Sequence, residues 1–193
     1  MVAKEPMLAL RERIVRAAAT MTMAQGWAAV TMAKLADVVG VSRQTVYNEI
    51  GGKPALAEAM VLDELARFLS LVNKAFADHP NDLVKAIEGA SRAVLEHADD
   101  NTLLHAIVSA THGADTELLP LLTTNSQSLL GVAKAVVAEF VTNQDTGLTP
   151  AQLDVAIDMV VRVVLSHVMQ PTASPAETAA GIAWMADRVL NPH

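Results

Sequence analysis

Residues 31–53 read TMAKLADVVGVSRQTVYNEIGGK, and this stretch decides the fold. Its first half places apolar residues on one side of a short helix that ends at Gly40, because glycine tolerates the left-handed backbone at which a helix stops. Ser42 can then cap a second helix by accepting a free backbone N–H of its first turn. Val46 lies on the inner side of that helix, and polar side chains occupy the outer side. Two short helices joined by such a turn predict a helix-turn-helix, whose second helix enters the major groove of double-stranded DNA.

Composition favours an all-helical protein. The chain has 193 residues, of which 52% are hydrophobic and only 3% aromatic, so its core consists of aliphatic side chains and methionine. No run of β-branched residues alternates with polar ones between turns, as it would in a half-buried strand. We therefore expect an all-α protein of about nine helices. A DNA-binding domain would cover residues 1–53, and a ligand-binding and dimerisation domain would cover residues 54–193.

Several classes of protein are excluded by what the sequence lacks. It contains no cysteine, which rules out disulfides and thiolate metal sites. No N-terminal stretch has the form of a signal peptide, and no apolar run reaches the ~20 residues of a membrane span. These features predict a soluble, cytoplasmic protein with no membrane partner.

Charge is unevenly distributed along the chain. The formal net charge is −7, yet residues 1–55 carry seven Lys or Arg against four acidic residues, while the remainder carries seven against 17. Attraction to phosphate is local, since charges are screened over ~8 Å at physiological salt. A basic N-terminal domain can therefore bind DNA although the whole protein is acidic.

Helical spacing and turn residues divide the rest of the chain. Beyond the two helices of the opening stretch, we expect helices over residues 7–25, 54–77, 81–98, 103–112 and 125–142. Pro120 should interrupt the segment that contains it. The helix over 54–77 is long, starts at the DNA-binding domain and ends in the second domain, so it would link the two mechanically.

The last two helices have clear starts and apolar surfaces. Thr149 and Ser174 each begin a capping box with proline at the first helical position. The helix after Thr149 is apolar almost all round, apart from Asp154, Asp158 and Arg162 on one thin stripe, and such a helix should be buried on nearly every side. We therefore predict a two-fold homodimer formed by both helices. Its interface is predicted to contain Ile157, Val160, Val161, Val164, Val168, Ile182, Ala183, Ala186 and Val189.

A longer motif surrounds the opening stretch. A first helix ends before an aromatic residue, residues 31–47 follow the pattern T-x-x-x-L-A-x-x-x-G-V-S-x-x-T-x-Y, and Lys53 comes after a glycine pair. Over about residues 10–60 this pattern resembles the TetR/AcrR family of bacterial transcriptional regulators. The family usually has an aromatic residue at the position of Ile50 and an acidic residue at that of Pro54. Isoleucine can still fill the core, and proline can still start a helix.

The resemblance implies a mechanism and a set of DNA contacts. A homodimer would place two recognition helices in successive major grooves of a palindromic operator, and a small molecule in each second domain would favour a shape that releases the DNA. By position in the motif, Arg43 and Gln44 would contact guanine and adenine edges, and Thr45 a base methyl group or a phosphate. The other residues at this surface, which would contact phosphates or cap the recognition helix, are Thr31, Ser42, Tyr47, Asn48 and Lys53.

No motif in residues 54–193 identifies the effector. The inner faces of the helices are aliphatic, and no basic residue falls clearly on one; Arg92 lies between Glu88 and Glu96 at helical spacing and is interpreted as a surface ion-pair residue. We therefore predict a lipophilic effector with a chain like that of a fatty acid, held by apolar contacts. The predicted pocket residues are Leu65, Phe68, Leu69, Val72, Ile87, Leu104, His105, Ile107, Val108, Leu122, Leu129 and Val164. Each of these side chains could instead simply fill the core.

Other functions fit the sequence less well. His105 and His112 are seven residues apart, but no histidine pair has the spacing of a helical metal site, so we expect neither a metal nor a cofactor. No nucleophile–base pair, glycine-rich phosphate loop or pair of carboxylates indicates an enzyme. An activator, or a protein-interaction module of the same fold without a small-molecule effector, is the alternative to the predicted repressor.

Overall fold

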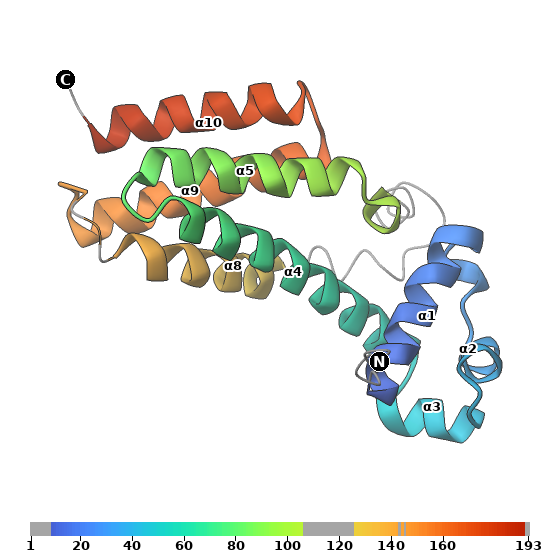
Figure 1. Cartoon of the computed structure of the whole chain (residues 1–193). Coiled ribbons are helices and arrows are strands. Elements are labelled where there is room, and N and C mark those ends of the chain that lie inside the picture. The colour runs from blue at the N-terminus through green and yellow to red at the C-terminus, as the bar shows by residue number, and fades with distance from the viewer. Residues whose placement is uncertain (1–8, 106–125, 143, 145, 192–193) are drawn as a thin grey trace, which may run out of the picture. The chain divides into compact units, whose positions relative to one another are not determined.

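The computed structural model describes residues 9–105, 126–142, 144 and 146–191, without the side chains of residues 126–129 (Figure 1). Every regular element in these residues is helical, which confirms the predicted all-α class. Within the same ranges, no helix combines the length and the apolar character needed to cross a membrane. The elements are α1 (Leu10–Gln25), the 3-10 helix η1 (Trp27–Ala29), α2 (Met32–Val39), α3 (Arg43–Ile50), α4 (Lys53–Asp78), α5 (Leu83–Asp99), α8 (Ser126–Val141), α9 (Pro150–Met169) and α10 (Pro175–Leu190).

Most predicted helix ends lie within two residues of the observed ones. The predicted capping boxes are confirmed on both C-terminal helices. Gln152 Oε1 accepts the N–H of Thr149 at 2.9 Å, and Glu177 Oε2 accepts the N–H of Ser174 at 3.1 Å. The short predicted helix begins at residue 102; its continuation and the expected interruption at Pro120 lie outside the described residues.

The chain divides into two compact units. The described residues of the head unit are 9–64 and 102–105, and those of the body unit are 65–101, 126–142, 144 and 146–191. The sequence suggested a boundary after residue 53, but the head unit continues along α4 to Glu64. The physical reason is that the first turns of α4 pack into the core of the head unit, where Leu56 is fully buried.

One apolar cluster holds the head unit together. Ile14 of α1, Leu35 of α2 and Val46 of α3 are completely buried in it, and Trp27 of η1 is buried in the same cluster. Burying a side chain of this size contributes about 1.5–3 kcal/mol. The shared cluster therefore fixes α2 and α3 against α1.

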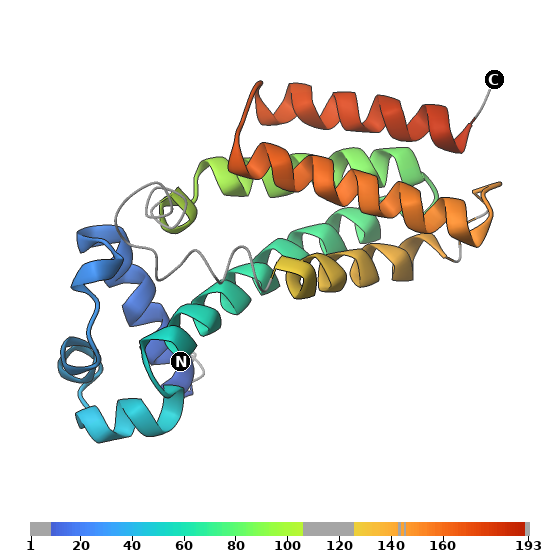
Figure 2. The same ribbon diagram turned by 180° about the vertical axis from the view of Figure 1, so that it is seen from behind.

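The helices of the body unit lie in three layers. Both views show α5 and α9 between α10 on one side and α8 with the second part of α4 on the other (Figures 1 and 2). The rings of Phe76 on α4 and Phe140 on α8 stack with their centroids 4.9 Å apart. α10 packs mainly on α5 and buries Ile182. This packing places α4, α5, α8 and α9 around a common interior.

α9 is less buried in this chain than its apolar surface predicts. Of the residues in α9, only Ile157 and Val161 are buried. Val155 and Met159 are 56% and 58% exposed. Within the described residues, one apolar side of α9 is therefore left uncovered.

Candidate DNA-binding surface and effector cavity

The turn between α2 and α3 has the geometry that the sequence predicts. Gly40 ends α2 in the left-handed region, with φ 76° and ψ 39°. Its N–H and that of Val41 both donate to the carbonyl of Ala36, at 2.9 and 3.0 Å. Ser42 Oγ then caps α3 by accepting the N–H of Thr45 at 3.0 Å, and it lies 2.8 Å from the Thr45 hydroxyl oxygen. The segment is a helix-turn-helix.

The outer side of α3 carries two ordered pairs of polar side chains. Arg43 Nη2 donates to the Tyr47 hydroxyl at 3.4 Å, and the guanidinium carbon lies 5.4 Å from the tyrosine ring centroid. Gln44 Nε2 donates to Asn48 Oδ1 at 3.0 Å. All four side chains are exposed, and each pair has the i, i+4 spacing at which helical neighbours interact. The surface thus presents a guanidinium and an amide, the groups that pair with guanine and adenine edges.

Two arginines of α1 hold the C-terminal ends of α2 and α3. Arg13 Nη2 donates to the carbonyl of Val39 at 2.7 Å, and Arg11 Nη1 donates to that of Glu49 at 2.8 Å. Such carbonyls lack partners within their own helix, and a cation near them is favourable. From the sequence, these two arginines entered only the count of basic residues in the N-terminal domain. No local signal could have found the contacts, because the carbonyls lie 26 and 38 residues farther along the chain.

Thr31 and Lys53, two of the predicted DNA-binding residues, stand at helix starts. The exposed Thr31 caps α2 by accepting the N–H of Lys34 at 3.2 Å. Lys53 is half-buried, with Nζ 4.9 Å from the ring centroid of Trp27. The buried indole N–H of Trp27 has no hydrogen-bond partner among the described residues. Both predicted residues therefore also have a structural role in the head unit.

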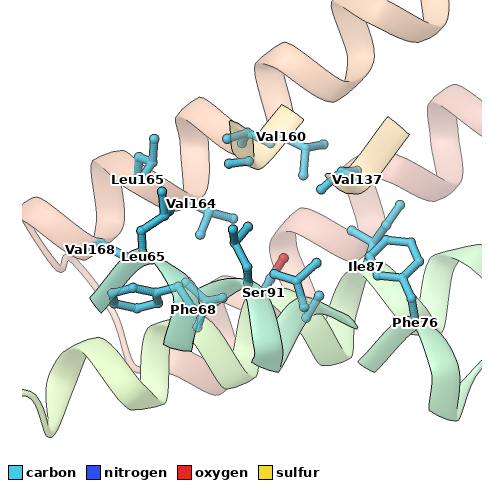
Figure 3. Close-up of a pocket in the computed structure, with 16 residues that line it drawn as sticks. Leu65, Phe68, Phe76, Ile87, Ser91, Val137, Val160, Val164, Leu165 and Val168 are labelled. Carbon is cyan, nitrogen blue, oxygen red and sulfur yellow. The ribbon is translucent and has the colours of Figure 1, made fainter. Parts of the chain in front are cut away.

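An apolar cavity of about 140 Å³ lies within the body unit (Figure 3). Helices α4, α5, α8 and α9 form its walls, and Ser91 of α5 is the one lining residue with a polar side chain. Six predicted pocket residues line it, namely Leu65, Phe68, Leu69, Val72, Ile87 and Val164.

The other predicted pocket residues do not line this cavity or cannot be placed. Leu104 and His105 belong to the head unit and are not among the residues that line this cavity, so their assignment to the effector pocket stays a prediction. Ile107, Val108 and Leu122, as well as the side chain of Leu129, lie outside the described residues. Among the lining residues, the prediction missed Phe76 of α4, Ser91 and Val94 of α5, Val137 of α8 and Leu165 of α9.

Most residues predicted for the dimer interface are covered within the chain itself. They are the buried Ile157, Val161, Ile182, Ala183 and Ala186, and the half-buried Val160, Val164 and Val168; Val160, Val161, Val164 and Val168 all line the cavity. Val189 is exposed, at 47%. Trp184 of α10, which the prediction did not include, is 63% exposed.

Histidines form no metal site in the part of the chain that the structure describes, where no group of three or more metal-binding side chains occurs. His97 packs edge-on against Phe68 in the body unit, with the ring centroids 5.0 Å apart. His105 is exposed in the head unit, and His112 lies outside the described residues.

Two protein-family models match the chain. One, for bacterial regulatory proteins of the tetR family, matches residues 14–60, and another, for the C-terminal domain of the bacterial tetracyclin repressor, matches residues 82–188, more than half of the chain. The chain belongs to the TetR family. This TetR-family protein is a DNA-binding transcriptional regulator and not an enzyme. Its helix-turn-helix falls inside the first match, and α9, α5 and most of α10 fall inside the second.

Similar proteins cover nearly the whole chain. The HTH-type transcriptional regulator AlkX of Mycobacterium tuberculosis is 26% identical over 183 residues, which are 95% of this chain and 84% of that protein. The crystal structure of the TetR family repressor AlkX from Dietzia sp. has a TM-score of 0.74 at 24% identity and covers 96% of this chain and 97% of that one. The regulator RolR in complex with resorcinol has a TM-score of 0.61 at 15% identity, covering 95% and 94%. These structures share the fold of the TetR-family chain.

Proposed function

We propose that this TetR-family regulator is a repressor that binds a palindromic operator as a homodimer and is released by a small lipophilic effector with acyl-chain character. The observation that carries the proposal is the role of α4. Leu56 near its start packs in the head core, and Phe68 and Val72 farther along line the apolar cavity. One continuous helix therefore belongs both to the unit that carries α3 and to the unit that can hold a ligand. An effector with different affinities for two conformations of the body unit would shift their populations and, through α4, the spacing of the recognition helices.

On the DNA, the outer side of α3 would enter the major groove. Arg43 and Gln44 are proposed to contact base edges, and Thr45 a base methyl group or a phosphate. Arg43 and Gln44 are exposed and Thr45 is half-buried, on the side of the helix away from the buried Val46, which supports this assignment. Phosphate contacts, which position the protein without reading sequence, are proposed for Thr31, Tyr47, Asn48 and Lys53.

The proposed dimer uses the uncovered apolar residues of α9 and α10. Met159 of α9 and Met185 and Val189 of α10 border one apolar groove of about 190 Å³, and all three side chains are at least 40% exposed. Contiguous exposed apolar surface of this kind marks an interaction site. In a two-fold dimer each copy presents the same patch to the other. The two α3 helices would then meet half-sites about 34 Å apart, one turn of DNA.

The character of the proposed effector follows from the cavity and from the relatives. The cavity walls offer hydrocarbon contacts almost throughout, and such walls select apolar ligands. The Dietzia AlkX repressor is implicated in biodegradation of n-alkanes, which are lipophilic compounds. RolR binds resorcinol, a small molecule. These relatives support repression relieved by a small lipophilic compound.

The proposal is tested by the DNA that the protein selects. The purified full-length chain is incubated with DNA from upstream of its own gene and with random-sequence DNA, and bound fragments are sequenced. We expect a palindrome bound with a Kd of about 10⁻⁸ M or below at physiological salt, with affinity falling steeply as salt rises. The absence of a common palindrome, or binding indifferent to salt, would contradict the proposal.

A further inference from the structure

Ser91 is a buried residue whose hydroxyl forms no hydrogen bond with a described residue and opens into the cavity. The residue is 4% exposed, and its oxygen is not among the fully enclosed polar atoms. A buried helical hydroxyl usually donates to the carbonyl four residues earlier, as Thr22 of α1 does to Ala18 at 2.8 Å. Ser91 instead lines the cavity, and its oxygen, drawn in red in Figure 3, is the one side-chain heteroatom among the lining residues. A ligand group that hydrogen-bonds to this oxygen would remove the cost of leaving it unpaired.

We infer that the effector of this cavity is uncharged and carries one hydroxyl or carbonyl group, which Ser91 binds. The rest of the effector is a hydrocarbon body of about six carbons, because cavities of about 150 Å³ hold ligands of that size. The inference rests on the proposed function, because it concerns the ligand of the same site. It narrows the acyl-chain class to its neutral members, such as alcohols, aldehydes and esters.

The cations of the body unit support a neutral ligand. No Lys or Arg lines the cavity. Lys134 follows the lining residue Ala133, but its ammonium group is bound to Asp158 at 3.2 Å and Asp154 at 3.4 Å. The hydrogen bond with Asp158 raises the pKa of Lys134, with a smaller contribution from Asp154. Arg162 donates to the same Asp158 carboxylate at 2.7 Å. Both cations are therefore paired with carboxylates, and neither residue lines the cavity.

The remaining basic residues of the body unit are no better placed. Three form ion pairs at the surface, with the partners Lys74–Asp78, Lys85–Asp82 and Arg92–Glu96. Arg67 and Arg188 are exposed. Residues 106–125 contain neither Lys nor Arg, so this segment can bring no permanent cation to a ligand. A carboxylate in the cavity would therefore be buried without a counter-ion, which is strongly unfavourable.

The test compares three ligands of equal chain length with the full-length protein. Calorimetric titrations at neutral pH measure the Kd of n-hexane, 1-hexanol and hexanoate. We expect 1-hexanol to bind about fivefold more tightly than n-hexane through one hydrogen bond, and hexanoate to bind at least about 100-fold more weakly than 1-hexanol. In Ser91→Ala, the Kd of 1-hexanol should rise about fivefold and that of n-hexane should stay unchanged. Ser70→Ala, the same substitution at an exposed position of α4, should leave all three values unchanged.

Three outcomes would overturn the inference. They are hexanoate binding within tenfold of 1-hexanol, equal effects of Ser91→Ala on 1-hexanol and n-hexane, and no binding of any of the three. The proposed function has a separate readout, the Kd for operator DNA. If the three ligands bind in the expected order and operator affinity does not change, the inference stands and the proposed function fails. If hexanoate binds best and releases the operator, the proposed function stands and the inference fails.

Discussion

The guanidinium of Arg13 donates a 2.7 Å hydrogen bond to the carbonyl oxygen of Val39. This bond ties α1 to the last residue of α2, one residue before the turn that leads to α3. A charged donor satisfies a carbonyl that has no partner inside its own helix. The position of the recognition helix therefore depends on a side chain outside the helix-turn-helix.

Replacing Arg13 by alanine should weaken DNA binding without removing a DNA contact. We expect Arg13→Ala to lower the free energy of unfolding by about 1 kcal/mol and to raise the operator Kd, with the slope of log Kd against log salt unchanged. Arg16→Ala is the control, because it removes the same charge from an exposed position of α1. Denaturant unfolding and fluorescence anisotropy measure the two quantities. Equal effects of both variants would contradict a positioning role.

Gln44 should contribute to sequence discrimination more than to stability. We expect Gln44→Ala to reduce the preference for the selected operator over a version with one altered adenine by about 1–3 kcal/mol. Its thermal unfolding midpoint should stay unchanged, since the side chain is exposed and its bond to Asn48 is local. Anisotropy titrations with the two DNA duplexes measure the preference. A uniform loss on both duplexes would assign Gln44 to phosphate contact instead.

Two glycine-to-alanine substitutions should have opposite effects on stability. Gly40→Ala forces alanine into a left-handed backbone with φ 76°, and we expect it to destabilise the protein by about 1–2 kcal/mol. Gly131→Ala in α8 should stabilise it by about 0.5–1 kcal/mol, because alanine is the better helix former. In both cases the added Cβ would lie more than 4 Å from every described atom outside its local backbone and chain neighbours. The two changes in the free energy of unfolding therefore report backbone conformation and not side-chain packing. Urea denaturation gives both values, and effects of the same sign would contradict this account.

A charge in the apolar groove should dissociate the proposed dimer. Met185 on α10 and Val132 on α8 are similarly exposed, at 40% and 42%. Only Met185 borders the α9–α10 groove. We expect Met185→Glu to convert the dimer to a monomer, because the interface would bury an unpaired carboxylate, and Val132→Glu to leave it intact. Light scattering during size-exclusion chromatography measures the mass. A monomeric wild type, or two dimeric variants, would refute this interface.

The cap of α10 should give a small acid dependence. Glu177 accepts hydrogen bonds from the Ser174 hydroxyl at 2.6 Å and from its N–H at 3.1 Å. These bonds hold the pKa of Glu177 below 4.5, its ordinary value. Its contribution to stability is therefore complete above pH 4.5 and is lost as the pH falls through the lower, folded-state pKa. Glu177→Gln cannot titrate, so between about pH 5 and about pH 3 its Tm should fall less than that of the wild type. If the Tm of both proteins fell equally over this pH range, the hydrogen bonds of Glu177 would not depend on the ionisation of its carboxyl group.

The sequence predicted those features whose signals are local. Gly40 with Ser42 marked the turn, and Thr149 and Ser174 marked the C-terminal helix starts, because each signal acts within three or four residues. The bond between Arg13 and Val39 could not be predicted in this way. It depends on how α1 crosses α2, which the chain between them does not reveal.

The cavity was predicted only in part for a related reason. The apolar sides of α4 and α5 are narrow enough for spacing alone to identify Phe68 and Ile87. α9 is apolar nearly all round, so spacing could not separate Val160 on the cavity side from Met159 on the exposed side. Ser91 gave no signal, since a lone serine in an apolar helix commonly bonds to its own backbone.

The coupling between the cavity and the DNA is the most direct test of the central claim. The Kd for a labelled operator is measured by anisotropy with and without 1-hexanol, at a concentration at which calorimetry shows the cavity to be filled. We predict that the filled cavity weakens operator binding by about fivefold or more, and that the operator weakens 1-hexanol binding by the same factor. An unchanged operator Kd with the cavity filled would contradict the account.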